Sequence, residues 1–175
     1  VGPVRWPAGT PPGSFVTYQC PAGRVVSGLT IDRGDIIDRV GVRCHAPSWG
    51  SGDAPTSLGL AASATNVVSC PAGNGVVQLS SASVSYFGGT VLAQINMTCG
   101  GSDGTTVVTR AGGQDAVLAT TPLAALCPAG EIAVGIGVGI EGRGFVRSFN
   151  VQCAALSPDR MSYGTPHTVG TLIGT

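Results

Sequence analysis

Hydrophobic and polar residues alternate in three nine-residue segments, 36–44, 91–99 and 145–153, each of which ends in a cysteine. The segments align without a gap, and in each one apolar side chains stand two and four residues before the cysteine. These pairs are Val40 and Val42, Ile95 and Met97, and Phe149 and Val151. A period of two residues predicts a β-strand with one buried face, on which the cysteine also lies.

A Cys-Pro-Ala-Gly motif precedes each of these strands and divides the chain into three repeats. The motif begins at Cys20, Cys70 and Cys127. The repeat cores are 20–44, 70–99 and 127–153, and Gly-rich turns at 33–35, 88–89 and 142–144 divide each core into two apolar halves. Because proline presets φ and glycine tolerates positive φ, Pro-Ala-Gly is typical of a turn. Each repeat is therefore predicted to contain a β-hairpin.

The segments between the cores predict additional strands. The connectors 45–69 and 100–126 are rich in Gly, Ser and Thr, and no segment has the pattern of an amphipathic helix. The termini, 1–19 and 154–175, resemble the two ends of such a connector. We therefore expect residues 1–175 to form one all-β domain, in which the first and last strands pair and close the third sheet.

The six cysteines allow fifteen pairings, and the repeat selects one bridge in each unit. The expected disulfides are Cys20–Cys44, Cys70–Cys99 and Cys127–Cys153. Each closes a loop that stabilises the fold by roughly 3 kcal/mol in the chain-entropy model. A zinc site is disfavoured because its ligands usually include two that lie within about four residues of each other. Disulfides imply an oxidising, extracellular compartment.

Composition narrows the classes of partner. Hydrophobic residues make up 43% of the chain and charged residues 10%, there is no Lys, and nine Arg balance nine acidic residues. A net charge of zero gives no field to attract nucleic acid, and it favours self-association. No apolar run is long enough to span a membrane. The start at Val1 rather than Met fits a mature secreted protein from which a signal peptide has been removed.

The first repeat, CPAGRVVSGLTIDRGDIIDRVGVRC, resembles the repeat of vitelline membrane outer layer protein 1, and Ser48-Trp49-Gly50 resembles the Trp-Gly connector of that family. The same stretch resembles a strand pair of jacalin-type lectins, with cysteine in place of an aromatic residue. Both resemblances imply a β-prism, in which three Greek-key sheets surround a pseudo-threefold axis. Only the first repeat has an Asp-rich turn.

Sugar binding requires an aromatic platform beside a few polar groups. We expect Asp35, Asp38 and Arg39 to contact hydroxyl groups and Trp49 to supply a platform. The other aromatic candidates are Trp6, Tyr18, Tyr86 and Tyr163. Alternatively, Trp6 and Trp49 fill the ends of the prism.

The remaining motifs have simpler interpretations. Arg33-Gly34-Asp35 matches an integrin-binding tripeptide but is also ordinary turn chemistry. Asn96-Met97-Thr98 is a sequon, so Asn96 is a candidate glycosylation site. The glycines of 137–142 satisfy GxGxxG, yet a strand rather than a helix is expected to follow them, so no nucleotide cofactor is predicted.

Acidic residues and histidines are the remaining candidates for catalysis or metal binding. Carboxylates that could support glycoside hydrolysis are Asp32, Asp35, Asp38, Glu131 and Glu141. His45 and His167 have no patterned partner for a metal or a catalytic triad and are expected on surface loops. We therefore predict no catalytic residues, no metal and no cofactor.

Three functions remain. The first is a secreted, non-enzymatic carbohydrate-binding module. The second is a self-assembling structural subunit of an extracellular coat or filament, for which zero net charge, few charged residues and disulfides argue. The third, implied only by the likeness to the vitelline membrane protein, is a transferase or hydrolase of amino-sugar oligomers. The expected partners are accordingly glycans or copies of the chain itself.

Overall fold

The computed structural model describes residues 15–34, 36–59, 66–101, 106–110, 120–142, 144–159 and 161–170, which form twelve strands and no helix. The strands are β1 (Phe15–Gln19), β2 (Val25–Arg33), β3 (Ile37–His45), β4 (Thr56–Leu58), β5 (Asn66–Ser69), β6 (Asn74–Tyr86), β7 (Gly89–Gly101), β8 (Thr106–Arg110), β9 (Thr120–Leu126), β10 (Glu131–Ile140), β11 (Val146–Ala155) and β12 (His167–Val169).

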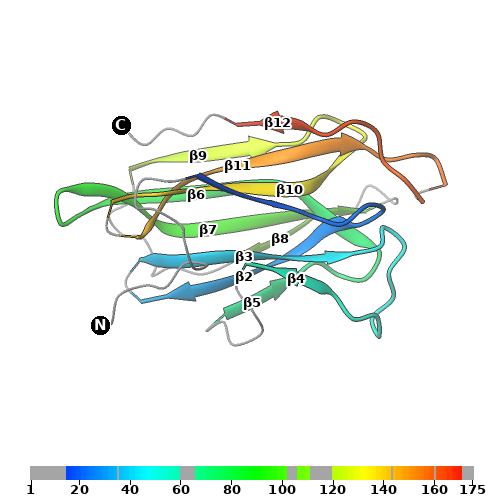
Figure 1. Cartoon of the computed structure of the whole chain (residues 1–175), viewed down its shortest axis with the longest axis horizontal. Helices are drawn as coiled ribbons and strands as arrows, with labels where there is room; N and C mark the ends of the chain where they lie inside the picture. The colour runs from blue at the N-terminus through cyan, green and yellow to red at the C-terminus, as the bar shows by residue number, and fades with distance from the viewer. Residues whose placement is uncertain are drawn as a thin grey trace.

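The strands form three four-stranded antiparallel sheets with one topology (Figure 1). Their orders are β4-β3-β2-β5, β8-β7-β6-β9 and β12-β11-β10-β1. In each sheet a long central hairpin is flanked by one strand from the connector that follows it and by the strand that leads into the next Cys-Pro-Ala-Gly motif. This Greek-key order, repeated three times, is the predicted all-β β-prism.

The period-two segments lie in the central hairpins and face the core. All six apolar side chains two and four residues before a cysteine are buried, and so are all six cysteines. The Pro-Ala-Gly turns also form as predicted. Gly23, Gly73 and Gly130 have φ values of 73°, 72° and 83°, which favour glycine.

Each central hairpin contains a β-bulge seven residues after its first cysteine. The bulged residues are Ser27, Val77 and Val134. Their carbonyl groups accept a backbone hydrogen bond from the first cysteine of the strand alongside. The three bonds run from Cys70 N to Ser27 O at 2.7 Å, from Cys127 N to Val77 O at 2.8 Å and from Cys20 N to Val134 O at 2.9 Å. Each bulge therefore marks the end of an edge strand and holds the cysteine that follows it.

The three predicted disulfides form, and each one joins two sheets. Cys20 continues β1 in the third sheet, whereas its partner Cys44 lies on β3 in the first sheet. Cys70–Cys99 likewise joins the first sheet to the second, and Cys127–Cys153 joins the second to the third. The Cα–Cα distances are 5.6 to 5.8 Å. The disulfides thus close a ring of three sheets.

The prediction that the first and last strands pair with each other is wrong. β1 pairs with β10, and β12 pairs with β11, so the two strands lie on opposite edges of one sheet. The reason is the Greek-key order, which places the strand before a Cys-Pro-Ala-Gly motif beside the first strand of a hairpin and the connector strand beside the second. Residues 1–14 and 171–175 of the termini lie outside the described residues.

Three equivalent positions, each five residues after a first cysteine, meet at the interior of the prism. They are Val25, Gly75 and Ile132, all of them buried. A Cβ placed on Gly75 would lie 2.3 Å from Cδ1 of Ile132 and 3.2 Å from Cγ2 of Val25. The glycine therefore makes room for two branched side chains, and the threefold symmetry is broken at this point.

Replacing Gly75 by alanine should destabilise the protein because the new methyl group overlaps buried Ile132. We expect a loss of about 1–3 kcal/mol in the free energy of unfolding, measured with urea. Gly52→Ala is the matched control, since nothing lies within 4 Å of a Cβ at Gly52. Ile132→Val, which removes the overlapping Cδ1, should partly rescue Gly75→Ala. Equal stability of the two alanine variants would contradict this packing.

Candidate functional site

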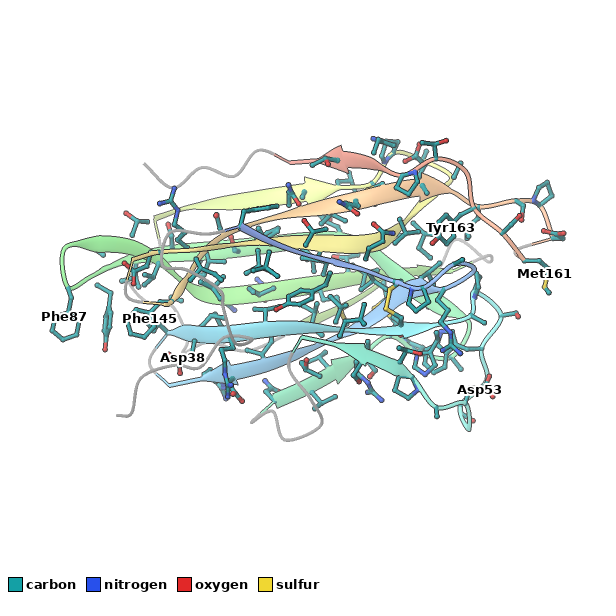
Figure 2. All side chains as sticks on the ribbon, in the orientation of Figure 1. Asp38, Asp53, Phe87, Phe145, Met161 and Tyr163 are labelled. Atoms are coloured by element: carbon teal, nitrogen blue, oxygen red, sulfur yellow. A yellow bond between two sulfur atoms is a disulfide. The ribbon has the colours of Figure 1, made fainter. Side chains whose placement is uncertain are left out.

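The prism has two chemically different ends. The turns of the three central hairpins, at 33–37, 86–89 and 140–146, form what we call the hairpin end. The Pro-Ala-Gly turns, together with the described residues of 46–55 and 156–166, form the cysteine end. Figure 2 shows Asp38, Phe87 and Phe145 at the hairpin end, whereas Asp53, Met161 and Tyr163 lie at the cysteine end.

The structure separates the predicted sugar-contact residues. Asp38 and Arg39 lie at the start of β3, near the hairpin end, and Trp49 follows the other end of the same strand. At about 3.3 Å per residue, β3 holds the two groups roughly 25 Å apart. Asp35 lies outside the described residues. Trp49 therefore does not form one platform with Asp38 and Arg39.

Asp38 and Arg39 differ in how they are held. Arg39 is paired across the hairpin with Asp32 and forms an ion pair with its carboxylate. The Asp38 carboxylate lies against the turn, with Oδ2 3.9 Å from the position of a Cβ on Gly34. One acidic group is therefore neutralised within the sheet, and a second is placed over the glycine of the turn.

Trp49 has a structural role at the cysteine end. Its ring stacks on His45 with a centroid distance of 4.1 Å, and its indole N–H donates to the Asn74 carbonyl at 3.0 Å. Because Asn74 follows the second Pro-Ala-Gly turn, Trp49 joins the first connector to the second repeat. Only 8% of Trp49 is exposed. This arrangement agrees with the alternative interpretation that tryptophan fills an end of the prism; Trp6 lies outside the described residues.

His45 is buried, so its expected place on a surface loop is wrong. It is the last residue of β3, with Nε2 3.1 Å from the Asp53 carbonyl and Nδ1 2.5 Å from the Ser27 hydroxyl. In the neutral ring, Nε2–H donates to the Asp53 carbonyl, while Nδ1 lies next to the Ser27 hydroxyl, which is also 3.1 Å from the Arg43 carbonyl. Burial lowers the pKa of His45, and although the Asp53 hydrogen bond opposes this shift, the charges of Arg43 and Arg24 reinforce it.

An aromatic row lies at the hairpin end. Tyr86 contacts both Phe87 and Phe145, with centroid distances of 4.7 and 5.8 Å and interplanar angles of 85° and 90°. Figure 2 shows Phe87 and Phe145 on the same side of the molecule. Tyr86 was a candidate from the sequence, but Phe87 and Phe145 were not. The sequence feature that could have identified them is an aromatic residue next to the glycines of a turn. Glu141 lies beside the row, with Oε2 3.7 Å from a Cβ position on Gly89.

The other tyrosine candidates do not join this row. Tyr18 is buried, and its ring lies 2.6 Å from a Cβ position on Gly59, whose φ is 81°. Burial raises the pKa of Tyr18. Tyr163 lies at the cysteine end, where it forms an isolated bridge with Leu156. Of the described aromatic candidates, only Tyr86 therefore lies in the aromatic row of the hairpin end.

The two glutamates lie at opposite ends of one strand. Glu131 contacts His167 at 2.5 Å at the start of β10, and Glu141 follows the end of the same strand. His167 is exposed on β12, a strand rather than a loop. Within the described residues no group of three His, Cys, Asp or Glu side chains could hold a metal ion. The described part of the chain also has no helix with the length and apolar character of a membrane crossing.

The remaining motifs lie within the sheets. The glycines at 137 and 139 belong to β10, and a turn and then a strand follow them, so the helix that a dinucleotide site needs is missing from this described segment. A Cβ on Gly137 would lie 2.2 Å from the ring of Phe15, so only glycine leaves room for this ring on the strand. Asn96 is half-buried on β7, and its side-chain oxygen accepts a hydrogen bond from Gln94 at 3.2 Å.

Comparisons with known proteins support the fold through structure only. No protein-family model and no curated sequence matches the chain, so no sequence match connects it to vitelline membrane outer layer protein 1 in particular. A Calystegia sepium agglutinin is 14% identical with a TM-score of 0.57, and the alignment covers 89% of this chain and 95% of that one. A Malaysian banana lectin is 16% identical with a TM-score of 0.51, covering 86% and 90%.

A complex of artocarpin with mannotriose is also similar, with 12% identity, a TM-score of 0.51 and coverage of 88% of this chain and 95% of that one. At such identities the likeness concerns the fold and not the site. The chain thus has the β-prism fold of jacalin-like lectins.

The burial of His45 should make stability depend on pH. Because its pKa is lowered in the folded state, the unfolded chain takes up the proton first, and stability falls as the pH drops below about 6.5. We expect the urea midpoint of the wild-type protein to fall more between about pH 7.5 and 5.5 than that of His45→Gln. The variant starts from a lower stability, so the slope is compared. Parallel losses in both proteins would refute this role of His45.

Proposed function

We propose that the chain is a secreted, non-enzymatic, lectin-like module that binds carbohydrate at the hairpin end. The observation that carries the proposal is that one end of a β-prism holds a row of aromatic rings with the exposed Phe87, the carboxylates of Asp38 and Glu141, and glycine-containing turns. Sugars are bound by this combination because their C–H faces pack on aromatic rings while their hydroxyl groups bond to polar groups. The fold shared with the agglutinin and the lectins supports the same class of ligand.

Asp38 is the residue of this end to which we assign the main hydroxyl contacts. A carboxylate accepts hydrogen bonds at two oxygens, and it lies here over a turn without a side chain at Gly34. The missing side chain lets a sugar approach the turn closely. Arg39 and Asp35 belong to the same proposal, Arg39 through its guanidinium beside Asp32 and Asp35 as the neighbour of Gly34 in the sequence.

An extracellular location and the lack of catalysis belong to the same proposal. Three buried disulfides persist in an oxidising compartment, which supports secretion. Glycoside hydrolysis needs two carboxylates on either side of the scissile bond. Asp32 is held by Arg39, and Glu131 and Glu141 lie at opposite ends of β10, so these candidates do not support such a pair.

Asp38→Asn tests the proposed site directly. On a glycan array, we expect the wild-type protein to bind a defined set of saccharides and the variant to bind them roughly tenfold or more weakly, because a charged acceptor is lost. Glu131→Gln is the matched control, since it removes a carboxylate at the other end of the prism. A wild-type protein that binds no saccharide would reject the function, and equal binding by both variants would reject only the site.

A second function, self-assembly into an extracellular structure, is favoured by the edge strands. β1, β5 and β9 are equivalent edges of the three sheets, and each one carries an exposed apolar residue. Phe15, Val67 and Leu126 are 46%, 45% and 57% exposed. Apolar side chains on the edge of a sheet favour strand addition from a second chain.

Light scattering over a range of concentrations tests this second function. Under assembly, the average mass should rise with concentration, and Val67→Lys together with Leu126→Lys should lower it, since charged edge residues oppose strand pairing. Ser57→Lys, at an exposed position of the opposite edge strand β4, is the control. A constant monomer mass would eliminate assembly and leave the carbohydrate-binding proposal unaffected.

A further inference from the structure

Phe87 adopts a backbone conformation that disfavours its side chain. It is the only non-glycine residue in the described part of the chain with positive φ, at 48°. Gly88 follows with a φ of 81°, and Tyr86 pairs with Gly89. Two residues with positive φ between paired strands form a type I′ turn, in which Asn, Asp and Gly are preferred. A bulky aromatic residue is therefore an exception at this position.

Burial does not explain why the position holds phenylalanine. Phe87 is 73% exposed, the highest value among the exposed large hydrophobic residues that the structure describes. The residue is thus unfavourable both for the turn and for contact with water. Strain retained together with apolar exposure is typical of a residue kept for an interaction with another molecule.

Tyr86 joins Phe87 and Phe145 in one row. Tyr86 makes an edge-to-face contact with Phe87 on its own hairpin and another with Phe145 on the β10–β11 hairpin, so the row crosses from the second sheet to the third. Phe145 is fixed by its carbonyl, which accepts from Glu141 N–H at 2.9 Å, while Gly144 N–H donates to the Glu141 carbonyl at 2.9 Å. The backbone that carries Phe145 is therefore held by hydrogen bonds of its own turn.

The charges near the aromatic row favour a sugar over a membrane as its ligand. The Glu141 side chain reaches the β6–β7 turn, so a carboxylate lies beside the row. A carboxylate accepts sugar hydroxyl groups but is repelled by anionic lipid headgroups. The nine Arg of the chain are balanced by nine acidic residues and there is no Lys, so the protein has no net positive charge to attract it to an anionic membrane surface. These features favour a neutral, hydroxyl-rich ligand.

We propose that Phe87, Tyr86 and Phe145 form a stacking subsite for the C–H face of a pyranose ring, and that Glu141 accepts its hydroxyl groups. This subsite deepens the proposed function and rests on it. It is formed by the second and third hairpins, whereas Asp38 belongs to the first. A glycan chain that contacts both subsites would be bound at two separate points of the hairpin end.

The test uses Phe87→Asn, which suits the turn better than the wild-type residue. Its unfolding midpoint should equal or exceed that of the wild-type protein, so a loss of binding cannot come from unfolding. Phe87→Trp is the conservative variant that retains a ring. We would record saturation-transfer NMR spectra of the full chain with methyl α-D-mannopyranoside and methyl β-D-galactopyranoside as separate probes.

With wild-type protein, at least one glycoside should show saturation concentrated on the C–H protons of one ring face. Phe87→Asn should lose this face-selective pattern and bind roughly three- to tenfold more weakly, and Phe87→Trp should retain the pattern. Glu131→Gln, which removes a carboxylate at the cysteine end, is the control and should leave both the binding and the pattern unchanged. Equal face-selective saturation by wild type and Phe87→Asn would overturn the subsite alone.

Two further outcomes bear on the identity of the ligand. Saturation of neither glycoside by the wild-type protein would contradict the subsite for both sugars, and the glycan array would then decide the proposed function independently. Sedimentation with phosphatidylcholine vesicles that depends on Phe87, without any sugar saturation that depends on it, would assign the row to a membrane and overturn the proposal.

Discussion

The first cysteine of each repeat is the joint on which the prism depends, because its backbone belongs to one sheet and its sulfur is bonded to the next. The amide donates to the carbonyl of a bulged residue in its own sheet, as Cys70 does to Ser27. Its disulfide crosses to a buried cysteine of a neighbouring hairpin, as in Cys70–Cys99. Three such cysteines connect the three sheets in a ring. The strand that leads into each Cys-Pro-Ala-Gly motif therefore belongs to the sheet of the preceding hairpin, not to the sheet of its own repeat.

Period and repetition predicted the fold, because they report local structure three times over. The alternation before Cys44, Cys99 and Cys153 identified the central strands, and the repeated motif selected the disulfides. Neither signal states which strand lies beside which, so the pairing of the terminal strands was wrong. The bulged residues Ser27, Val77 and Val134 stand at one position of the repeat but are not turn residues such as Gly or Asn, so nothing in their residue types marked a bulge.

The candidate site was less predictable from the sequence. A turn motif does not show at which end of the prism the residues that follow it will lie. Trp49 and Asp38 are close in the sequence, but a whole strand lies between them. His45 resembled a loop residue because it follows the alternating segment, yet it is the last residue of β3 and is covered by Trp49. Phe87 and Phe145 both contact Tyr86, and the Tyr86–Phe145 contact joins two hairpins from different repeats.

The two ends of the prism differ in what they contain. The cysteine end holds the disulfides' first cysteines, the Trp49–His45 stack and the close packing at Gly75, which together fix the frame. The hairpin end contains short turns with the exposed Phe87, the half-buried Tyr86 and Phe145, and the carboxylates of Asp38 and Glu141. Proteins that are only 12% to 16% identical to this chain have the same frame.

Residue-specific hydrogen exchange at the amides of Cys20, Cys70 and Cys127, measured by NMR on the oxidised protein, tests the cyclic arrangement most directly. If β1 closes the third sheet as the other edge strands close theirs, all three amides should be strongly protected, because each donates to a bulged carbonyl. A Cys20 amide that exchanges at the rate of an unfolded chain, while those of Cys70 and Cys127 remain protected, would show that the ring is open and would contradict the account.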